Sequence, residues 1–305
     1  MMVSIRWGTG SAWAVALALL ASAPAGAQRK LELQQALPLD GPVLVQPSGL
    51  AWDGKNLLMV SSFHDDAVFK IELQADKATF KEMVRIHRPK DAAGKMSWRG
   101  LATDGHGNLY LASDANCRIM KVESDGDAEW EGPGLLETGA EKGLFSGENS
   151  GIEGIAIAGK KRFVVAASRE PRGLLQEDLS GPKPVLNALI EDKSKLPLPA
   201  GRRKPDFSDL AEDGGKLWAL SANADALCML TWNGQDYVEG EYWTFGHVSN
   251  DPKYRYAGLK MGLARGLAMD GQSVYVVLDN KGVGRQGDAN DKRPLLLVFK
   301  RPHGA

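Results

Sequence analysis

Charged, hydroxyl and amide side chains recur at two positions of a repeated strand pair. The first position opens each repeat and is occupied by Ser48, Arg99, Glu153, Ser208 and Arg265. The second follows the next expected strand and is occupied by Asp114, Asn223, Asp279 and Asn280. Antiparallel neighbours bring the start of one strand beside the end of the other, so these side chains should share one rim.

Oxygen ligands at this rim suit a hard cation. Calcium takes about six to eight oxygens, which scattered carboxylates, amides and loop carbonyls can supply. The candidate calcium ligands are Glu153, Asp114, Asn223 and Asp279. The alternative interpretation is that these are turn residues and rim ion pairs, such as Glu153 with Arg99.

Cations at the same rim suit an anion instead. A guanidinium can hold a carboxylate or phosphate by two parallel hydrogen bonds. The candidate ligand-binding residues are Arg99, Arg169, Arg265, Ser208 and His64. No catalytic residue is assigned, because His64 beside Asp65 and Asp66 is more often a loop histidine than a general base.

Motifs for other chemistries lack their structural context. Residues 282–287 fit the spacing G-x-G-x-x-G, but the Asp- and Pro-containing segment after them opens no helix, so a loop is expected. The five histidines show no metal-ligand spacing, and no G-x-S-x-G follows residue 27.

The elements that position the rim form a repeat. Each copy has a short "G-L-A" strand, an Asp or Gly turn and a β-rich strand, and intervals of 51, 54, 55 and 57 residues separate Gly49, Gly100, Gly154, Asp209 and Gly266. Such a period is typical of repeat architectures with one sheet per repeat. The chain is therefore expected to be all-β, a five-bladed β-propeller of four-stranded antiparallel blades, with six blades as the alternative if residues 186–205 contain a degenerate one.

Ring closure is expected from the N-terminal segment. The last repeat has no fourth strand of its own, and the alternating segment Lys30–Leu37 precedes the first repeat. Pairing of this segment with Leu295–Phe299 would complete the last blade and leave no exposed inner edge.

Three segments resemble the SdiA-regulated propeller family and, more loosely, the phytase-like domain named for esterase-like activity. They are Gly151–Ala156 (GIEGIA), Phe207–Asp213 (FSDLAED) followed by LWALSAN, and Val274–Gly282 (VYVVLDNKG). The resemblance implies an exported propeller with calcium in a central site. Where those families often have Glu before the repeat glycine, this chain has Arg99 and Arg265, so Glu153 is the clearest match.

The N-terminal pattern and the composition predict the compartment and the classes of partner. Arg6, an apolar run and Ala25-Gly26-Ala27 predict a signal peptide over residues 1–27, followed by one propeller domain over 28–305 in the periplasm or secreted. The net charge of −1 gives no reason to bind nucleic acid, and no later segment is apolar enough to span a membrane.

Cysteine and tryptophan positions predict packing roles. Cys117 and Cys228 fall in non-adjacent blades and are expected to be buried free thiols. The tryptophans beyond the signal peptide are expected to pack between sheets rather than to stack on sugars; they are Trp52, Trp98, Trp130, Trp218, Trp232 and Trp243.

Two functional hypotheses of different class follow, with a third that needs no metal. The first is binding of a small anionic or polar ligand, or of a periplasmic partner, at a calcium-associated channel mouth. The second is metal-assisted hydrolysis of phosphate or carboxylic esters. The third is a protein-interaction scaffold without a metal.

Overall fold

The computed structural model describes residues 29–147, 150–159, 161–181, 185–190, 194–259 and 261–302. The predicted signal peptide lies outside these ranges. Strands make up nearly all the regular structure of the described chain, and the helices α1 (Leu136–Glu141) and α2 (Gly246–Ser249) are short. No helix among these residues is long and apolar enough to cross a membrane.

Three sheets contain four strands each, in chain order. The first comprises β6 (Trp98–Thr103), β7 (Leu109–Ser113), β8 (Arg118–Val122) and β9 (Ala128–Glu131). The second comprises β10 (Ile152–Ile157), β11 (Arg162–Ala167), β12 (Gly173–Asp178) and β13 (Val185–Ile190). The third comprises β14 (Asp209–Asp213), β15 (Lys216–Ser221), β16 (Ala226–Trp232) and β17 (Tyr237–Thr244). Residues 185–190 form the fourth strand of the second sheet.

A fourth sheet has eight strands and consists of two halves. One half contains β2 (Pro47–Trp52), β3 (Leu57–Ser61), β4 (Ala67–Leu73) and β5 (Ala78–Arg85). The other contains β18 (Ala264–Met269), β19 (Ser273–Leu278), β20 (Leu295–Lys300) and β1 (Leu33–Asp40). β1 pairs antiparallel with β20. The end of β1 also pairs parallel with β5, where Leu39 lies opposite Ala78 and Asp40 opposite Thr79. The expected pairing of the N-terminal strand with the last repeat is confirmed.

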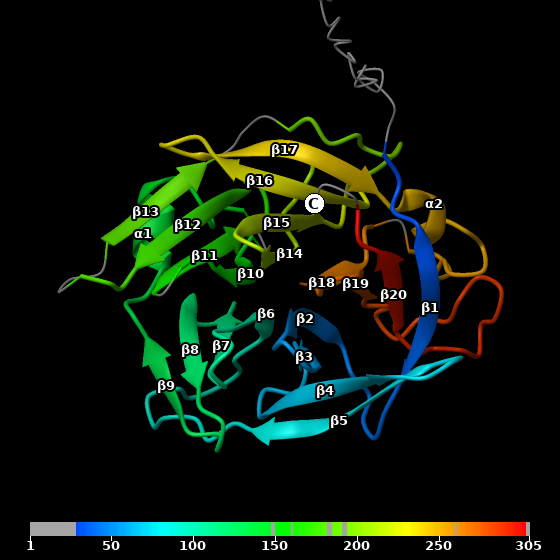
Figure 1. Ribbon diagram of the computed structural model, residues 1–305, viewed down its shortest axis with the longest axis horizontal. Coiled ribbons are helices and arrows are strands. Elements are labelled where there is room, and N and C mark those ends of the chain that lie inside the picture. The colour runs from blue at the N-terminus through cyan, green and yellow to red at the C-terminus, as the bar shows by residue number, and fades with distance from the viewer. Residues whose placement is uncertain are drawn as a thin grey trace, which may run out of the picture.

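The sheets form a ring whose inner strands are β2, β6, β10, β14 and β18 (Figure 1). Each inner strand contacts the next around the axis. The repeat glycines make this close approach feasible: a Cβ on Gly49 would lie 2.8 Å from the Arg99 carbonyl oxygen, and one on Gly154 would lie 2.7 Å from the Asp209 Cα. Any larger residue would push the inner strands apart.

Apolar side chains fill the space between neighbouring sheets, as expected for strands buried on both faces. Trp218 and Trp243 of one sheet pack with Leu267 and Phe299 of the next. Similar clusters lie between the other pairs of neighbouring sheets around the ring. Stacking of whole sheets thus holds the inner strand ends in place.

The two cysteines behave as predicted. Cys117 and Cys228 are buried and are not joined by a disulfide. Burial raises the pKa of the Cys117 thiol to about 11, so this thiol stays protonated at neutral pH.

Candidate functional site

Four of the five rim residues that open the repeats are extra residues in their ladders. The pairing shifts by one position at Ser48, Arg99, Glu153 and Arg265, immediately before the repeat glycine. Such β-bulges bend a strand and redirect the bulged side chain. Ser208 lies directly before β14, whose ladder begins at Asp209 without a shift.

One ion pair crosses the mouth of the ring. Nη1 of Arg265 lies 3.8 Å from Oε2 of Glu153, although the inner strand β14, preceded by Ser208, lies between their strands around the ring. The small Ser208 side chain turns away and donates its hydroxyl to the Leu220 carbonyl at 3.1 Å. Burial raises the pKa of the Asp206 carboxyl, and the nearby charge of Arg265 opposes this shift.

A second ion pair joins Arg99 and Asp114. Nη2 of Arg99 lies 3.5 Å from Oδ2 of Asp114. The Asp114 carboxyl packs against Gly151, where any Cβ would collide with Oδ1. Burial raises the pKa of Asp114, Arg99 opposes the shift and the negative charge of Glu153 adds to it. Arg99 therefore pairs with Asp114 and not, as the sequence suggested, with Glu153.

Both arginines retain an N–H that the described chain does not use. Nε of Arg99 and Nε of Arg265 are buried and have no hydrogen-bond partner among the described residues. Their carboxylate partners lie at 3.5 and 3.8 Å, longer than a good charged hydrogen bond. The half-buried Arg169, on the loop after β11, forms no ion pair within the described ranges.

Asp209 lies on the axis below these pairs and was missed as a functional candidate. Its Oδ2 accepts the backbone N–H of Leu267 at 2.7 Å and that of Leu50 at 3.4 Å, and its Oδ1 accepts that of Leu210 at 2.9 Å. Burial raises the pKa of this carboxyl well above its ordinary value, against the effect of the three amides. The sequence signal was its position, because the other four repeats have glycine there.

The remaining predicted residues have partners of their own. Asp279 forms an ion pair with Lys281, and Asn280 donates to the carbonyls of Val283 and Lys292. The backbone N–H of Asn223 donates to Asp206, and its Nδ2 donates to the Lys204 carbonyl.

His64 lies apart from the charged pairs. Its Nε2 is 2.8 Å from the Leu44 carbonyl oxygen, and its ring contacts Phe63 and Phe69 edge-on. These contacts account for its position without a role as a base.

A hollow of about 360 Å³ adjoins the mouth at Asn223. Arg202 and Arg203, on the basic loop that precedes β14, line it together with Gly258, Leu259 and Met261. Arg202 is held by Asp225 at 3.3 Å. The basic loop therefore contributes to the concave surface of the mouth.

Comparison with known proteins identifies the architecture. No family model matches the chain, and no curated protein sequence matches it. The glutaminyl cyclase of Myxococcus xanthus superposes with a TM-score of 0.54 at 11% identity, over 90% of this chain and 98% of that one. The fold is a β-propeller.

Further solved structures are similar at lower scores. The gluconolactonase of Xanthomonas campestris gives a TM-score of 0.46 at 11% identity, covering 88% of this propeller and 98% of that chain. A luciferin-regenerating enzyme gives 0.47 at 12%, covering 86% and 79%. At these identities the likeness concerns the fold alone.

The residues predicted to bind calcium each have a partner of their own in the described chain. No group of three or more His, Cys, Asp or Glu poised for a metal is found in the described ranges. The carboxylates of Glu153, Asp114 and Asp279 each lie beside a cationic side chain. A dication would have to displace or repel those cations, whereas an anion would meet free N–H groups.

Proposed function

We propose that this propeller binds a small polar anion at the mouth formed by Arg99, Glu153 and Arg265. The observation that carries the proposal is the pair of buried Nε–H donors of Arg99 and Arg265, which are unused within the described chain. An unpaired buried donor costs free energy that a ligand carboxylate or phosphate would recover.

The ligand should carry hydrogen-bond donors as well as negative charge. Glu153 and Asp114 remain beside the two guanidiniums, and both are acceptors when ionised. Hydroxyl or amino groups of a ligand would face these carboxylates while its anionic group faces the arginines. Such a mixed rim favours hydroxy acids, amino acids or phosphorylated polyols over a bare inorganic anion.

The number of blades, the family relationship and the export of the chain are part of the same proposal. We assign five blades, because five inner strands each open a set of four and β1 completes the set of β18. The motif resemblance supports an SdiA-regulated or phytase-like relationship. Export after cleavage near Ala27 rests on the N-terminal pattern, which suits a periplasmic or secreted receptor.

Calcium and hydrolysis form the second candidate function. The pKa of Asp114, which burial raises, is the observation that favours it, since a raised pKa makes a carboxyl a better general acid. Calcium would fit this mouth only together with a bound anion that offsets Arg99 and Arg265, so metal and anion binding should then reinforce each other.

The test is calorimetric titration of the mature protein with inorganic phosphate, malate and calcium, singly and in pairs. Arg99→Gln and Arg265→Gln should each weaken binding of the anion about tenfold or more. Arg85→Gln, which changes an exposed arginine on β5 paired with Asp66, is the matched control and should leave the affinity unchanged.

Three results would redirect the proposal. Anion binding that is insensitive to both arginine substitutions would place the ligand elsewhere. Turnover of phosphate or carboxylic esters that stops with chelator would favour the hydrolase. Absence of binding by all three probes would leave the metal-free interaction scaffold.

A further inference from the structure

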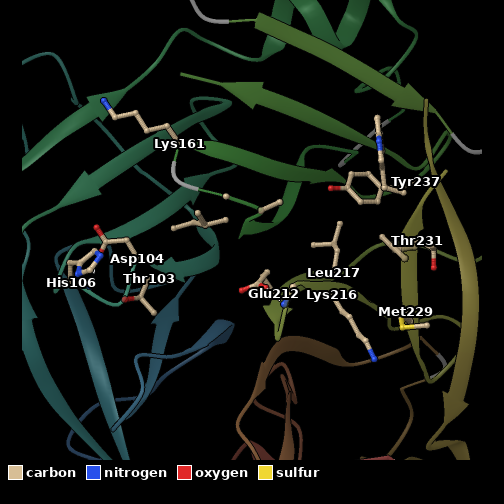
Figure 2. A pocket seen from close by; sticks show the side chains of 16 residues that line it. Thr103, Asp104, His106, Lys161, Glu212, Lys216, Leu217, Met229, Thr231 and Tyr237 are labelled. Atoms are coloured by element: carbon tan, nitrogen blue, oxygen red, sulfur yellow. Dashed lines mark hydrogen bonds between the residues drawn. The ribbon is translucent and has the colours of Figure 1, made fainter. Parts of the chain in front are cut away.

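A groove of about 1040 Å³ lies at the opposite end of the axis from the charged mouth. It is lined by the tight turns β6–β7, β10–β11 and β14–β15 and by the outer hairpin β16–β17 (Figure 2). These turns connect strand ends that point away from Arg99, Glu153 and Arg265. None of the residues predicted for ligand or metal binding lines it.

The groove continues into the axis and ends there. A narrow space of about 70 Å³ inside the ring is lined by the residues that follow the repeat glycines, and it shares Thr103, Ile157 and Glu212 with the groove. Above it, the Asp209 carboxylate joins the amides of Leu50 and Leu267 across the axis. A ligand in the groove is thereby separated from the mouth.

An aromatic pair borders the groove. Trp232 and Tyr237 are register partners at the end of the β16–β17 hairpin, with ring centroids 5.1 Å apart in an edge-to-face arrangement. Trp232 is 45% exposed, contrary to the expectation that it packs between sheets. The Tyr237 hydroxyl points across the groove, above Leu217 (Figure 2). An exposed indole beside a hollow offers an apolar face and an N–H to a ligand.

Charge in the groove is balanced. Asp104 and Glu212 line it together with Lys161 and Lys216. The Asp104 carboxylate accepts N–H groups of its own turn, and Glu212 accepts the Gly215 N–H at 2.6 Å. Neither an anion nor a cation is therefore favoured by the net field, while hydroxyl groups of Thr231 and Tyr237 add neutral donors and acceptors.

We propose that this groove binds a neutral saccharide. The C–H face of a sugar ring would pack against the exposed Trp232 indole, and its hydroxyls would bond to Tyr237, Thr231 and Glu212. The volume exceeds that of one monosaccharide and is at the upper end of the range for small-molecule sites, which suits two or three linked sugars. The site is separate from the anion site at the mouth and does not depend on it.

Tryptophan fluorescence and calorimetry of the mature protein with maltotriose, cellotriose and laminaritriose test this proposal. We expect saturable binding of at least one trisaccharide, weakened about tenfold or more in Trp232→Ala and less in Tyr237→Phe. Phe63→Ala removes a comparably exposed aromatic ring, 57% exposed, on the loop after β3 and should leave the affinity unchanged. Because Trp232 is exposed, Trp232→Ala should melt as the wild type does.

Other outcomes would overturn the proposal. If none of the three trisaccharides binds, the proposal is wrong. It is also wrong if Trp232→Ala binds a trisaccharide as tightly as the wild type does. Dodecanoate binding that is lost in Trp232→Ala, without any saccharide binding, would assign the groove to acyl chains instead. Arg99→Gln changes the charged mouth and should bind saccharides as the wild type does. The saccharide proposal and the anion proposal can therefore fail independently.

Discussion

Asp209 on the axis and Glu177 on β12 are both 0% exposed, yet their surroundings differ in one respect. Asp209 accepts three backbone N–H groups from three inner strands. Both oxygens of Glu177 are without a hydrogen-bond partner in the described chain. Burial raises the pKa of both, and for Glu177 the value reaches about 7, with Glu131 adding to the shift and Arg118 opposing it.

The difference shows what a propeller can do with a buried carboxylate. The axial edge of each inner strand has no neighbouring strand, so its amides need another acceptor. Asp209 supplies that acceptor to three strands at once. Glu177 lies on β12, whose backbone pairs in ladders with β11 and β13. The charge of Arg118 acts on Glu177, but Nε of Arg118 is itself without a hydrogen-bond partner in the described ranges.

The largest effect is expected for Asp209→Ala. Three buried amides would lose their acceptor, so the free energy of unfolding should fall by about 4 kcal/mol. Urea denaturation at neutral pH measures it. Asp53→Ala, which removes an acceptor for two amides in an exposed turn, is the control and should cost about 1 kcal/mol. Asp209→Gly, the residue of the other repeats, should be similarly unstable; wild-type stability in both variants would contradict the comparison.

Glu239 on β17 extends the comparison to a buried carboxylate with side-chain donors. It accepts Arg172 at 2.6 Å, the Ser194 hydroxyl at 2.9 Å and the Lys195 N–H at 2.6 Å. Glu239→Ala should lower the free energy of unfolding by about 3 kcal/mol, because it removes the buried carboxylate that accepts all three of these hydrogen bonds. Glu241→Ala, on the same strand, removes only an exposed pair with Arg29 and should cost less than about 1 kcal/mol. Equal losses would show that burial does not decide the effect.

Glu177→Gln should act in the opposite direction. The pKa of Glu177 in the folded protein is raised from 4.5 to about 7, so its stabilising contribution is complete below about pH 4.5 and is lost as the pH rises to about 7. Glu177→Gln should therefore be more stable than the wild type at pH 8, by up to about 3 kcal/mol, and equal to it at pH 4. Denaturation at both pH values measures this. Glu129→Gln, which removes an exposed carboxylate paired with Lys121, is the control and should change the stability at pH 8 by less than about 1 kcal/mol. A destabilised Glu177→Gln at pH 8 would refute the contrast.

The smallest effect is expected at the mouth. Burial raises the pKa of Asp114 more than Arg99 lowers it, so an uncharged isostere should be tolerated. Asp114→Asn should increase the free energy of unfolding by less than about 1 kcal/mol at neutral pH. A loss larger than that in urea denaturation would show that the Arg99–Asp114 pair is a strong structural contact, and would weaken the case for a ligand at Arg99.

The parts of the fold that were predictable depend on local patterns. The repeat interval placed the inner strands, and the alternation in Lys30–Leu37 indicated β1, which pairs with β20. The same interval placed Arg99, Glu153 and Arg265 at one rim, because the residue before each repeat glycine lies near the start of an inner strand.

The contacts that the sequence did not predict join side chains from strands that are not neighbours in the repeat pattern. The ion pair considered as an alternative for Glu153 was with Arg99 on the neighbouring strand, but Arg265 reaches Glu153 past the small Ser208. Asp209 was read as one member of the repeat, although its carboxylate crosses the axis. Trp232 alternates like a core residue, but it ends β16 where the next sheet no longer covers it.

The axial carboxylate also bears on how long the folded ring lasts. Its bonds to Leu50 and Leu267 join residues 159 and 58 positions apart in the chain. Contacts of such long sequence separation carry the largest loop-closure entropy and are expected to form after the sheets themselves. Interactions absent from the transition state slow unfolding without speeding folding. Asp209 should therefore prolong the lifetime of the native state, and with it resistance to proteases, more than it influences the rate of refolding.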